Sequence, residues 1–412
     1  MESIIRDALL APQGAAKIEW VRQHMPVLSG IAAEFRRDQP FQGLTVVVCV
    51  HLEAKTAYLA QVLREGGAEV YAIGSNPLST QDDVCAALAA AGVKVLATHG
   101  CDMETYHRYA CLALSVCPDV MIDDGGDLVH ILHEEHPEWA VNLRGGCEET
   151  TTGIVRLQSR VRAGKLHFPM FNINDADCKH LFDNRYGTGQ SVWDGIMRTT
   201  NLVVAGSTVV VGGYGWCGKG VAMRAKGLGA TVIVTEVEPV KAIEAAMDGL
   251  TVLPMAQAAP LGDVFVTVTG CEGVITPAHM LTMKQGAIMS NAGHFDVEVD
   301  VAGLRKLAVS HFEARHNIEG YVLPNGKTVY LLAEGRLVNL AAGDGHPAEI
   351  MDMSFALQAL CARRMAEQGT ALPHDVLAVP ADIDQGVAKR KLTALGIAID
   401  ALTPEQDRYL HG

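Results

Sequence analysis

The sequence lacks the features that mark membrane proteins, secreted proteins and nucleic-acid-binding proteins. No hydrophobic run approaches the length of a membrane span, and the opening MESIIRDALLAPQG carries acids early without a long apolar core. No block of Lys or Arg occurs, and the formal net charge is −14 at pH 7. We therefore expect no membrane association, no signal peptide and no nucleic-acid partner.

Paired cysteines are also missing. The 10 cysteines are scattered without a C-x-x-C pair, which favours reduced thiols in a cytoplasmic protein over disulfides or a zinc site. We accordingly assign no metal ligands. The 412 residues are 49% hydrophobic and 19% charged, without an internal repeat or low-complexity tract. This composition indicates two or three globular domains with ample core.

One stretch, VVVGGYGWCGKGVAMRAKGLGATVIVTE at 209–236, indicates a cofactor. A β-branched run precedes the G-x-G-x-x-G of Gly213, Gly215 and Gly218, and a helix and a second apolar run follow. Gly213 permits a tight turn, Gly215 lets backbone approach a pyrophosphate, and Gly218 lets the helix pack close to the strand. Glu236 is placed to accept from both ribose hydroxyls, so the pattern predicts NAD rather than NADP.

The N-terminal half predicts a second α/β unit. After an amphipathic helix at 16–35, apolar runs at 44–50, 69–73, 93–97 and 120–122 alternate with helical stretches to 115. Such alternation implies an open parallel sheet, which binds ligands beyond the carboxyl ends of its strands. His51 and Asp124 follow two of these strands, so together they are a candidate site.

The rest of the chain contributes further pairs and elements. We treat 125–200 as a connecting region, within which Lys179 and Asp183 share a face if the segment is helical. Strands at 264–268 and 287–289, a hairpin turning at Asn325-Gly326 and a helix at 351–368 follow. The expected fold class is α/β, with two doubly wound parallel-sheet domains and a short helical C-terminal tail.

Long blocks of the sequence resemble one family from end to end. They are DDGGDL at 123–128, EETTTG at 148–153, FDNRYGTGQS at 182–191, GGYGWCGKG at 212–220, NAGHFDVEVDV at 291–301, LLAEGRLVNLAAGDGHP at 331–347 and LTPEQDRYL at 402–410. They resemble the S-adenosylhomocysteine hydrolase family. The resemblance implies a tightly bound, recycled NAD and a homotetramer. It also implies a substrate-binding domain of residues 1–185 and 347–380, an NAD-binding domain of 186–346, and a tail of 381–412 for contacts between subunits.

The reaction implied is reversible hydrolysis of S-adenosyl-L-homocysteine to adenosine and L-homocysteine. A thioether at C5′ is a poor leaving group until hydride transfer to NAD turns the 3′-hydroxyl into a ketone, which acidifies C4′–H. Elimination, water addition and re-reduction then complete a cycle that consumes no cofactor. Such a site needs a base for the 3′-hydroxyl, a base for C4′–H, an acid–base group beside C5′, and walls that exclude water.

The resemblance supplies residues for these roles. The catalytic set is His51, Asp124, Glu149, Lys179, Asp183 and His294. Lys179 and Asp183 match the pair that deprotonates and orients the 3′-hydroxyl. Asp124 matches the base that removes the C4′ proton, and His51 matches the group near C5′. A lysine acting as a base needs a lowered pKa, which burial near other positive charge would supply.

Binding residues follow from the same resemblance. Substrate contacts are assigned to Glu53, Lys55, Thr56, His346, Met351 and Phe355. Cofactor contacts are assigned to Thr150, Thr151, Thr152, Asn184, Gly213, Gly215, Trp216, Cys217, Gly218, Glu236, Thr269, Asn291, Asn339 and His346.

The chain departs from the common family pattern at the base-recognition motif. It has Glu53 and Lys55 where the common form is His-x-Thr-x-Glu or Gln, and Thr188 where many members carry Cys. The first difference leaves open a paralogue that acts on S-inosylhomocysteine or that dehydrates another nucleoside. A non-catalytic NAD-binding regulator, as some relatives are, is a further alternative. The last predicts loss of a catalytic residue, and all are present. A simple dehydrogenase that releases NADH is a weaker fourth.

Overall fold

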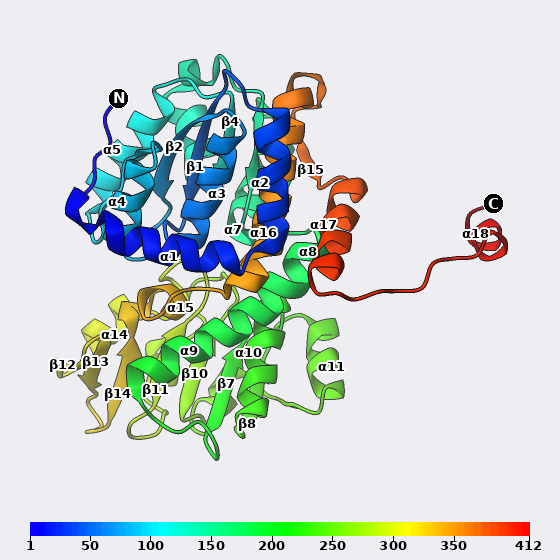
Figure 1. The fold of residues 1–412 in the computed structure, drawn as a ribbon. Helices are drawn as coiled ribbons and strands as arrows, with labels where there is room; N and C mark the ends of the chain where they lie inside the picture. Colours follow the sequence, from blue (N-terminus) through cyan, green and yellow to red (C-terminus); the bar gives the residue numbers. More distant parts are fainter.

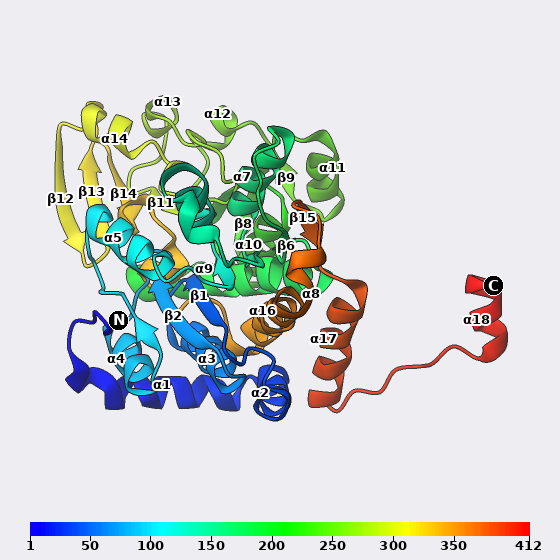
Figure 2. The same cartoon turned by 90° about the horizontal axis from the view of Figure 1, so that it is seen from above.

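The computed structural model describes residues 1–412, which form two α/β bodies and an extended C-terminal segment (Figures 1 and 2). The first body is built on a seven-stranded sheet in which every paired neighbour is parallel. In spatial order its strands are β15 (Val376–Ala378), β6 (Met170–Asn172), β5 (Gly145–Glu148), β4 (Val120–Asp123), β1 (Thr45–Val50), β2 (Glu69–Gly74) and β3 (Lys94–Val95).

The second body has an eight-stranded sheet whose edge is antiparallel. Its order is β12 (Ser310–Arg315), β13 (Ile318–Val322), β14 (Thr328–Leu332), β11 (Ile288–Asn291), β10 (Val264–Thr267), β7 (Thr208–Gly212), β8 (Thr231–Thr235) and β9 (Thr251–Val252). The predicted Asn325-Gly326 turn joins β13 to β14, with Gly326 at φ +81°. The antiparallel ribbon β12–β13 makes this sheet mixed rather than wholly parallel.

Helices cover both faces of each sheet. Those packed around the first sheet are α1 (Ala11–Gln23), α2 (Pro26–Asp38), α3 (Ala54–Glu65), α4 (Asp82–Ala90), α5 (Met103–Leu114), α6 (Asp127–His130), α7 (Thr151–Arg162), α8 (Asp177–Lys179), α16 (Ala348–Gln368) and α17 (Ala381–Ala394). Those around the second are α9 (Thr188–Thr200), α10 (Trp216–Gly227), α11 (Pro239–Met247), α12 (Met255–Ala258), α13 (Pro277–Met280), α14 (Val301–Leu307) and α15 (Val338–Ala341). No helix has the length and apolar character needed to cross a membrane.

Successive side chains of the buried strands point alternately to the two faces of each sheet, so each sheet has an apolar core on both faces. Val46, Val48 and Val50 of β1 join one apolar cluster, and Val47 and Cys49 join the cluster on the opposite face. In β7 the neighbours Val209 and Val210 likewise point into different clusters. Both central strands are therefore buried on both faces, as helix-covered parallel sheets require.

Two predictions of secondary structure from the sequence were wrong. The helix predicted over 16–35 is two helices, because Pro26 lacks an N–H and stands at the start of α2. The region 125–200 is not merely a connection, since it supplies β5, β6 and α7 to the first body. These strands escaped detection because Gly145-Gly146-Cys147-Glu148 and Met170-Phe171-Asn172 lack a β-branched residue.

The C-terminal segment divides in two. Helix α17 packs on the first body with Ile383 and Val387 buried, and Arg390 forms an ion pair with Glu34 of α2. Helix α18 (Pro404–His411) stands apart at the end of an extended stretch, with every residue exposed (Figure 1).

Candidate functional site

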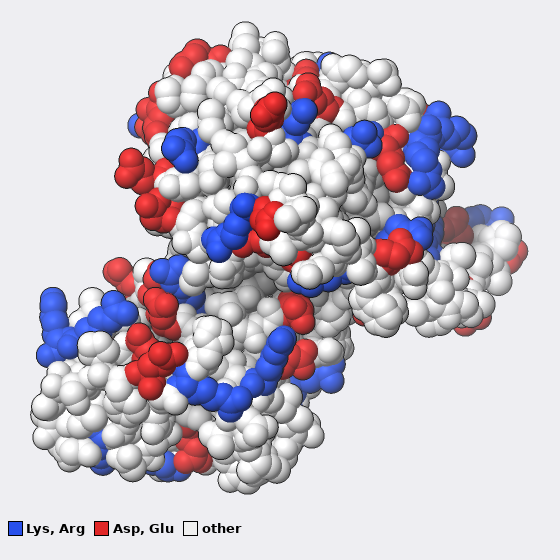
Figure 3. All heavy atoms as spheres, turned by 60° about the vertical axis from the view of Figure 1, so that its left-hand side comes forward, with Lys and Arg blue, Asp and Glu red and all other residues white.

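A single cavity of about 580 Å³ brings together residues of both bodies. The order of the parallel strands reverses between β1 and β4 in the first sheet and between β7 and β10 in the second. Ligand sites in open α/β sheets lie at such reversals, beyond the carboxyl ends of the strands. Both reversals contribute to this cavity, and Figure 3 shows a hollow between the two bodies.

The first reversal carries His51 and Asp124, as predicted. The His51 Nε2 lies 3.6 Å from Asp124 Oδ2, and the Ser75 hydroxyl donates to the same oxygen at 2.9 Å. The Ser79 hydroxyl lies 2.6 Å from His51 Nδ1. Burial lowers the pKa of His51 to about 4 despite Asp124, and nearby His294 adds to the lowering. His51 is therefore neutral near pH 7 and lies where it can exchange a proton with a ligand.

Lys179 stands at the centre of a buried ion cluster. Its Nζ lies 3.1 Å from Asp183 Oδ2 and 3.4 Å from Glu149 Oε1, and donates to Asn184 Oδ1 at 2.8 Å. The predicted pairing of Lys179 with Asp183 is confirmed as a contact. Asp183 also bonds His346 Nδ1, so the cluster reaches across to the chain segment that leaves the second body.

The charge state of Lys179 depends on its buried neighbours. Burial alone would lower the pKa of Lys179, but Asp183 and Glu149 outweigh it and raise the pKa above its ordinary value. Lys179 and His346 conversely hold the pKa of Asp183 below its usual range, although burial opposes them. The lowered pKa that a lysine base needs is therefore not found in this structure, because the nearest charged neighbours of Lys179 are carboxylates.

Two polar residues of α16 complete this cluster. The Ser354 hydroxyl donates to Asp183 Oδ2 at 2.7 Å, and Gln358 Nε2 donates to Glu149 Oε2. Sequence reasoning missed both, although their spacing of four places them on one face of a largely apolar helix. Burial raises the pKa of Glu149 to about 7, with Lys179 opposing the rise.

A second pair of carboxyls lies directly beneath the site. Asp123 and Glu148 are neighbours across β4 and β5, each one residue before a candidate catalytic group. Glu148 Oε1 accepts from the backbone N–H of Gly125 and of Thr150, which fixes the loops that follow both strands. Burial raises the pKa of both carboxyls, to about 7 for Asp123.

Glu53 and Lys55 form their own pair at the cavity wall. Lys55 Nζ lies 2.6 Å from Glu53 Oε2 and donates to the Asp344 carbonyl at 3.0 Å. The carboxylate of Glu53 also accepts from the Thr56 and Lys55 backbone as the N-cap of α3. Lys55 is only 6% exposed, so it does not point to solvent.

The glycine loop on the opposite side behaves as its pattern predicts. Gly213 has φ +105°, and a Cβ on Gly218 would lie 2.1 Å from the Gly213 carbonyl oxygen, which explains why α10 needs glycine there. A Cβ on Gly215 would meet nothing within 4 Å. Gly215 borders the cavity as the N-cap of α10, where no side chain caps the helix. The loop thus leaves open space at a helix N-terminus, which suits phosphate.

Most predicted binding residues line the cavity. They are Glu53, Lys55, Thr56, Thr150, Thr151, Thr152, Asn184, Gly215, Trp216, Cys217, Thr269, Asn339, His346, Met351 and Phe355, beside the catalytic His51, Asp124, Glu149, Lys179, Asp183 and His294. Four predicted cofactor residues do not: Gly213, Gly218, Glu236 and Asn291. Asn291 is fully buried, and its amide bonds the Gly293 and Phe295 carbonyls, so it shapes the loop that carries His294.

Glu236 lies at the end of β8 beside the glycine loop. Its Oε2 accepts from Tyr214 N–H at 2.7 Å, and its Oε1 accepts from Val237 and Glu238 N–H. Burial works against these bonds, yet they hold the pKa of Glu236 below its usual value. The carboxylate is therefore anionic and oriented, with lone pairs remaining for further donors.

Comparison with known proteins agrees with this geometry. The model of "S-adenosyl-L-homocysteine hydrolase" matches residues 2–142, and that of its "NAD binding domain" matches residues 184–345. A protein of Methanococcus maripaludis named S-inosyl-L-homocysteine hydrolase is 55% identical, over 99% of this chain and 98% of its own. Adenosylhomocysteinases of Thermococcus kodakarensis and Aquifex aeolicus are 54% and 53% identical, over 98% and 100% of this chain and 96% and 98% of theirs. The chain belongs to the S-adenosyl-L-homocysteine hydrolase family, a family of hydrolases with an NAD-binding domain.

Proposed function

We propose that this protein catalyses the reversible hydrolysis of S-adenosyl-L-homocysteine to adenosine and L-homocysteine with a bound, recycled NAD. The observation that carries the proposal is that one cavity is shared by an open glycine loop and a buried acid–base set. Neither half alone distinguishes a dehydrogenase from a hydrolase, whereas the two together suit oxidation followed by elimination.

The residues present fit NAD. The space at Gly215 accommodates a pyrophosphate against the start of α10, and Glu236 is anionic beside that loop. Asn339 offers a buried Oδ1 with no hydrogen-bond partner on the cavity wall. When bound, the cofactor accepts a hydride from C3′ of the substrate and later returns it.

Lys179 and its neighbours would act at the 3′-hydroxyl. Because Lys179 is charged in this structure, it must give up a proton before it can accept one. Glu149 lies 3.4 Å away and, with a pKa of about 7, is the neighbour able to hold that proton. Asp183, held by Ser354 and His346, keeps Lys179 oriented.

Asp124 and His51 would act on the C4′–C5′ side. Asp124 accepts from Ser75 and lies within 3.6 Å of His51, so the two can pass a proton between C4′ and the leaving sulfur or the entering water. Neutral His51 is suited to that exchange because it can both donate and accept.

Product analysis tests the proposal. NAD-loaded protein incubated with S-adenosyl-L-homocysteine should yield equal amounts of adenosine and L-homocysteine by mass spectrometry, without accumulation of NADH. The reverse incubation should form the thioether. A dehydrated nucleoside or steady NADH release in place of these products would overturn the proposal.

Hydrolysis of S-inosyl-L-homocysteine is the second candidate, favoured by Glu53 and Lys55. A carboxylate accepts from the donor of either purine, and an ammonium donates to N1 of adenine or O6 of hypoxanthine. Because the pair lies on the cavity wall, we expect looser discrimination between the two substrates. The ratio of kcat/KM for the two should move in Glu53→Thr with Lys55→Glu. An unmoved ratio would mean that these residues do not select the base.

We further propose a cytoplasmic homotetramer. The exposed apolar residues of the C-terminal segment, Ile397, Ile399, Leu402, Tyr409 and Leu410, support contacts with another subunit. Light scattering of the full chain should give four times 44.0 kDa, and removal of residues 396–412 should lower that mass. An unchanged mass after removal would exclude the segment as an assembly contact.

A further inference from the structure

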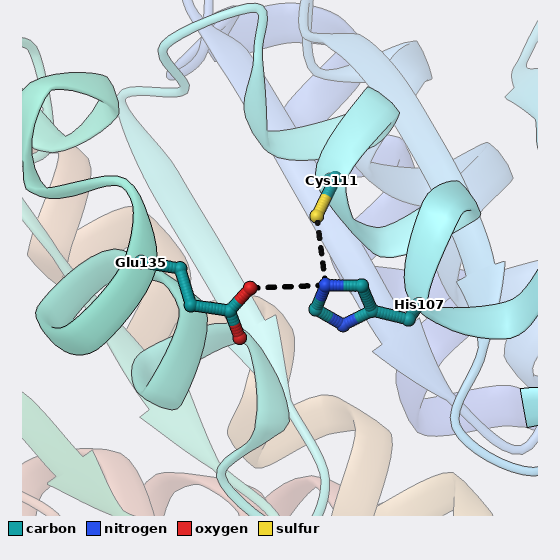
Figure 4. Close-up of side chains that lie close together, drawn as sticks. All are labelled: His107, Cys111 and Glu135. Carbon is teal, nitrogen blue, oxygen red and sulfur yellow. Dashed lines mark hydrogen bonds and ion pairs between the residues drawn. The ribbon is translucent and has the colours of Figure 1, made fainter. Parts of the chain in front are cut away.

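Three side chains with metal-binding atoms meet on the surface of the first body, among residues not used by the proposed reaction (Figure 4). His107 and Cys111 lie one turn apart on α5, and Glu135 comes from the π-helical segment Ile131–Glu135. His107 Nε2 lies 3.0 Å from Glu135 Oε2 and 3.5 Å from Cys111 Sγ. All three ligand atoms are within 4.8 Å of one another.

These separations suit one tetrahedral ion. Bonds of about 2.0–2.3 Å from zinc to nitrogen, oxygen and sulfur place neighbouring ligand atoms about 3.3–3.8 Å apart. Small movements of side chains would reach that geometry, because the His107 side chain is 49% exposed and that of Glu135 34%. A nitrogen, a thiolate and a carboxylate form a mixed set that favours Zn²⁺ over the harder Mg²⁺ or Ca²⁺.

A further histidine lies near the carboxylate. His130 Nε2 is 3.8 Å from Oε1 of Glu135, an ion-pair distance rather than a hydrogen bond. The other oxygen of Glu135, Oε2, faces His107 and is the one available to an ion. With three protein ligands, the fourth position would be left to water.

We propose that His107, Cys111 and Glu135 bind one Zn²⁺ ion, which replaces the thiol proton of Cys111 and releases it to solvent. The ion joins α5 to the segment that follows the Asp124-Gly125-Gly126 loop, so it stabilises the fold behind the site rather than taking part in the reaction. The spacing of the three residues does not predict this site, since Glu135 lies 24 residues beyond Cys111.

Cobalt substitution tests the ligands directly. NAD-loaded full-length protein, stripped with EDTA and dialysed, is titrated with CoCl₂ and then ZnCl₂. We expect a near-ultraviolet thiolate-to-cobalt absorption that saturates at one equivalent and is displaced by zinc. Cys111→Ser should abolish this absorption and His107→Ala should weaken it at least tenfold in affinity. Cys117→Ser, a change at another partly buried cysteine just beyond α5, should leave it intact.

The thermal melt supplies the second measurement. One equivalent of ZnCl₂ should raise the melting temperature of wild type and of Cys117→Ser, but not that of Cys111→Ser or His107→Ala. Equal melting temperatures of all four proteins in EDTA establish that the variants fold. No absorption in wild type, or an absorption that persists in Cys111→Ser and so belongs to another thiol such as Cys217, would overturn the proposal.

Discussion

The two bodies border the cavity with strand reversals of the same kind but contribute different chemistry to it. The first body contributes charged side chains that already bond one another, including Lys179, Asp183 and Glu149. The second contributes Gly215, at which even a Cβ would find empty space. The ion pairs of the first body are therefore formed without a ligand, whereas the loop at Gly215 in the second body leaves space that a ligand can occupy.

This difference predicts how each side responds to mutation. On the charged side, removing one group leaves buried partners without compensation, so both chemistry and stability suffer. On the glycine side, adding a methyl group at an open position disturbs only the ligand. The following predictions separate these effects, beginning with the largest.

Replacing Lys179 with Ala should reduce kcat about 10³-fold or more, since it removes the proposed base and exposes the carboxylates of Asp183 and Glu149 to each other. Rapid mixing with substrate should show no absorbance at the NADH band. Lys165→Ala, at an exposed lysine of the same body, is the matched control and should retain full activity. A Lys179→Ala protein that still reduces NAD at the wild-type rate would exclude the assigned role.

Two glycine substitutions should separate ligand binding from folding. Gly215→Ala should weaken NAD binding at least tenfold while costing at most about 1 kcal/mol of stability, because Gly215 has an ordinary φ of −69°. Gly218→Ala should lower the melting temperature of the NAD-free protein, because its Cβ would collide with the Gly213 carbonyl. Calorimetric titration and thermal melts give the two quantities. Equal melting temperatures of the two variants would contradict the distinction.

The pH dependence of stability should report on Glu149. Burial raises its pKa in the folded protein to about 7, while in the unfolded chain it titrates near about 4.3. The folded state therefore binds the proton more tightly, and the resulting stabilisation is complete below the unfolded pKa and lost as pH rises through 7. Glu149→Gln should lose less stability than wild type between pH 5 and 8, by on the order of 2–3 kcal/mol. Glu313→Gln, at an exposed strand, should follow wild type.

Sequence patterns predicted the parts of this molecule that depend on local physics. Runs of β-branched residues such as Val46-Val47-Val48 predict buried strands. The glycine pattern predicts the loop because Gly213 adopts a positive φ that favours glycine. The meeting of His51 with Asp124 followed from the topology of parallel sheets, since both stand at the ends of neighbouring strands. Family resemblance supplied the remaining site residues.

What escaped prediction depends on residues distant in the chain. The charge on Lys179 depends on Glu149, 30 positions earlier, as well as on the predicted partner Asp183, and Ser354 reaches Asp183 from α16. The pairing of Lys55 with the Asp344 carbonyl spans 289 positions. No local pattern encodes these contacts. Glu149 and Lys179 follow different strands of the first sheet, and the other two contacts form only where the chain returns from the second body to the first.

The proposed reaction requires one site to support both oxidation of the substrate and removal of its C4′ proton. Turnover of S-adenosyl-L-homocysteine by NAD-loaded protein in D₂O tests both steps in a single measurement. We expect deuterium at C4′ of the recovered adenosine, with no net conversion of NAD to NADH. Adenosine that keeps its original hydrogen at C4′, or NADH that accumulates in step with product, would contradict it.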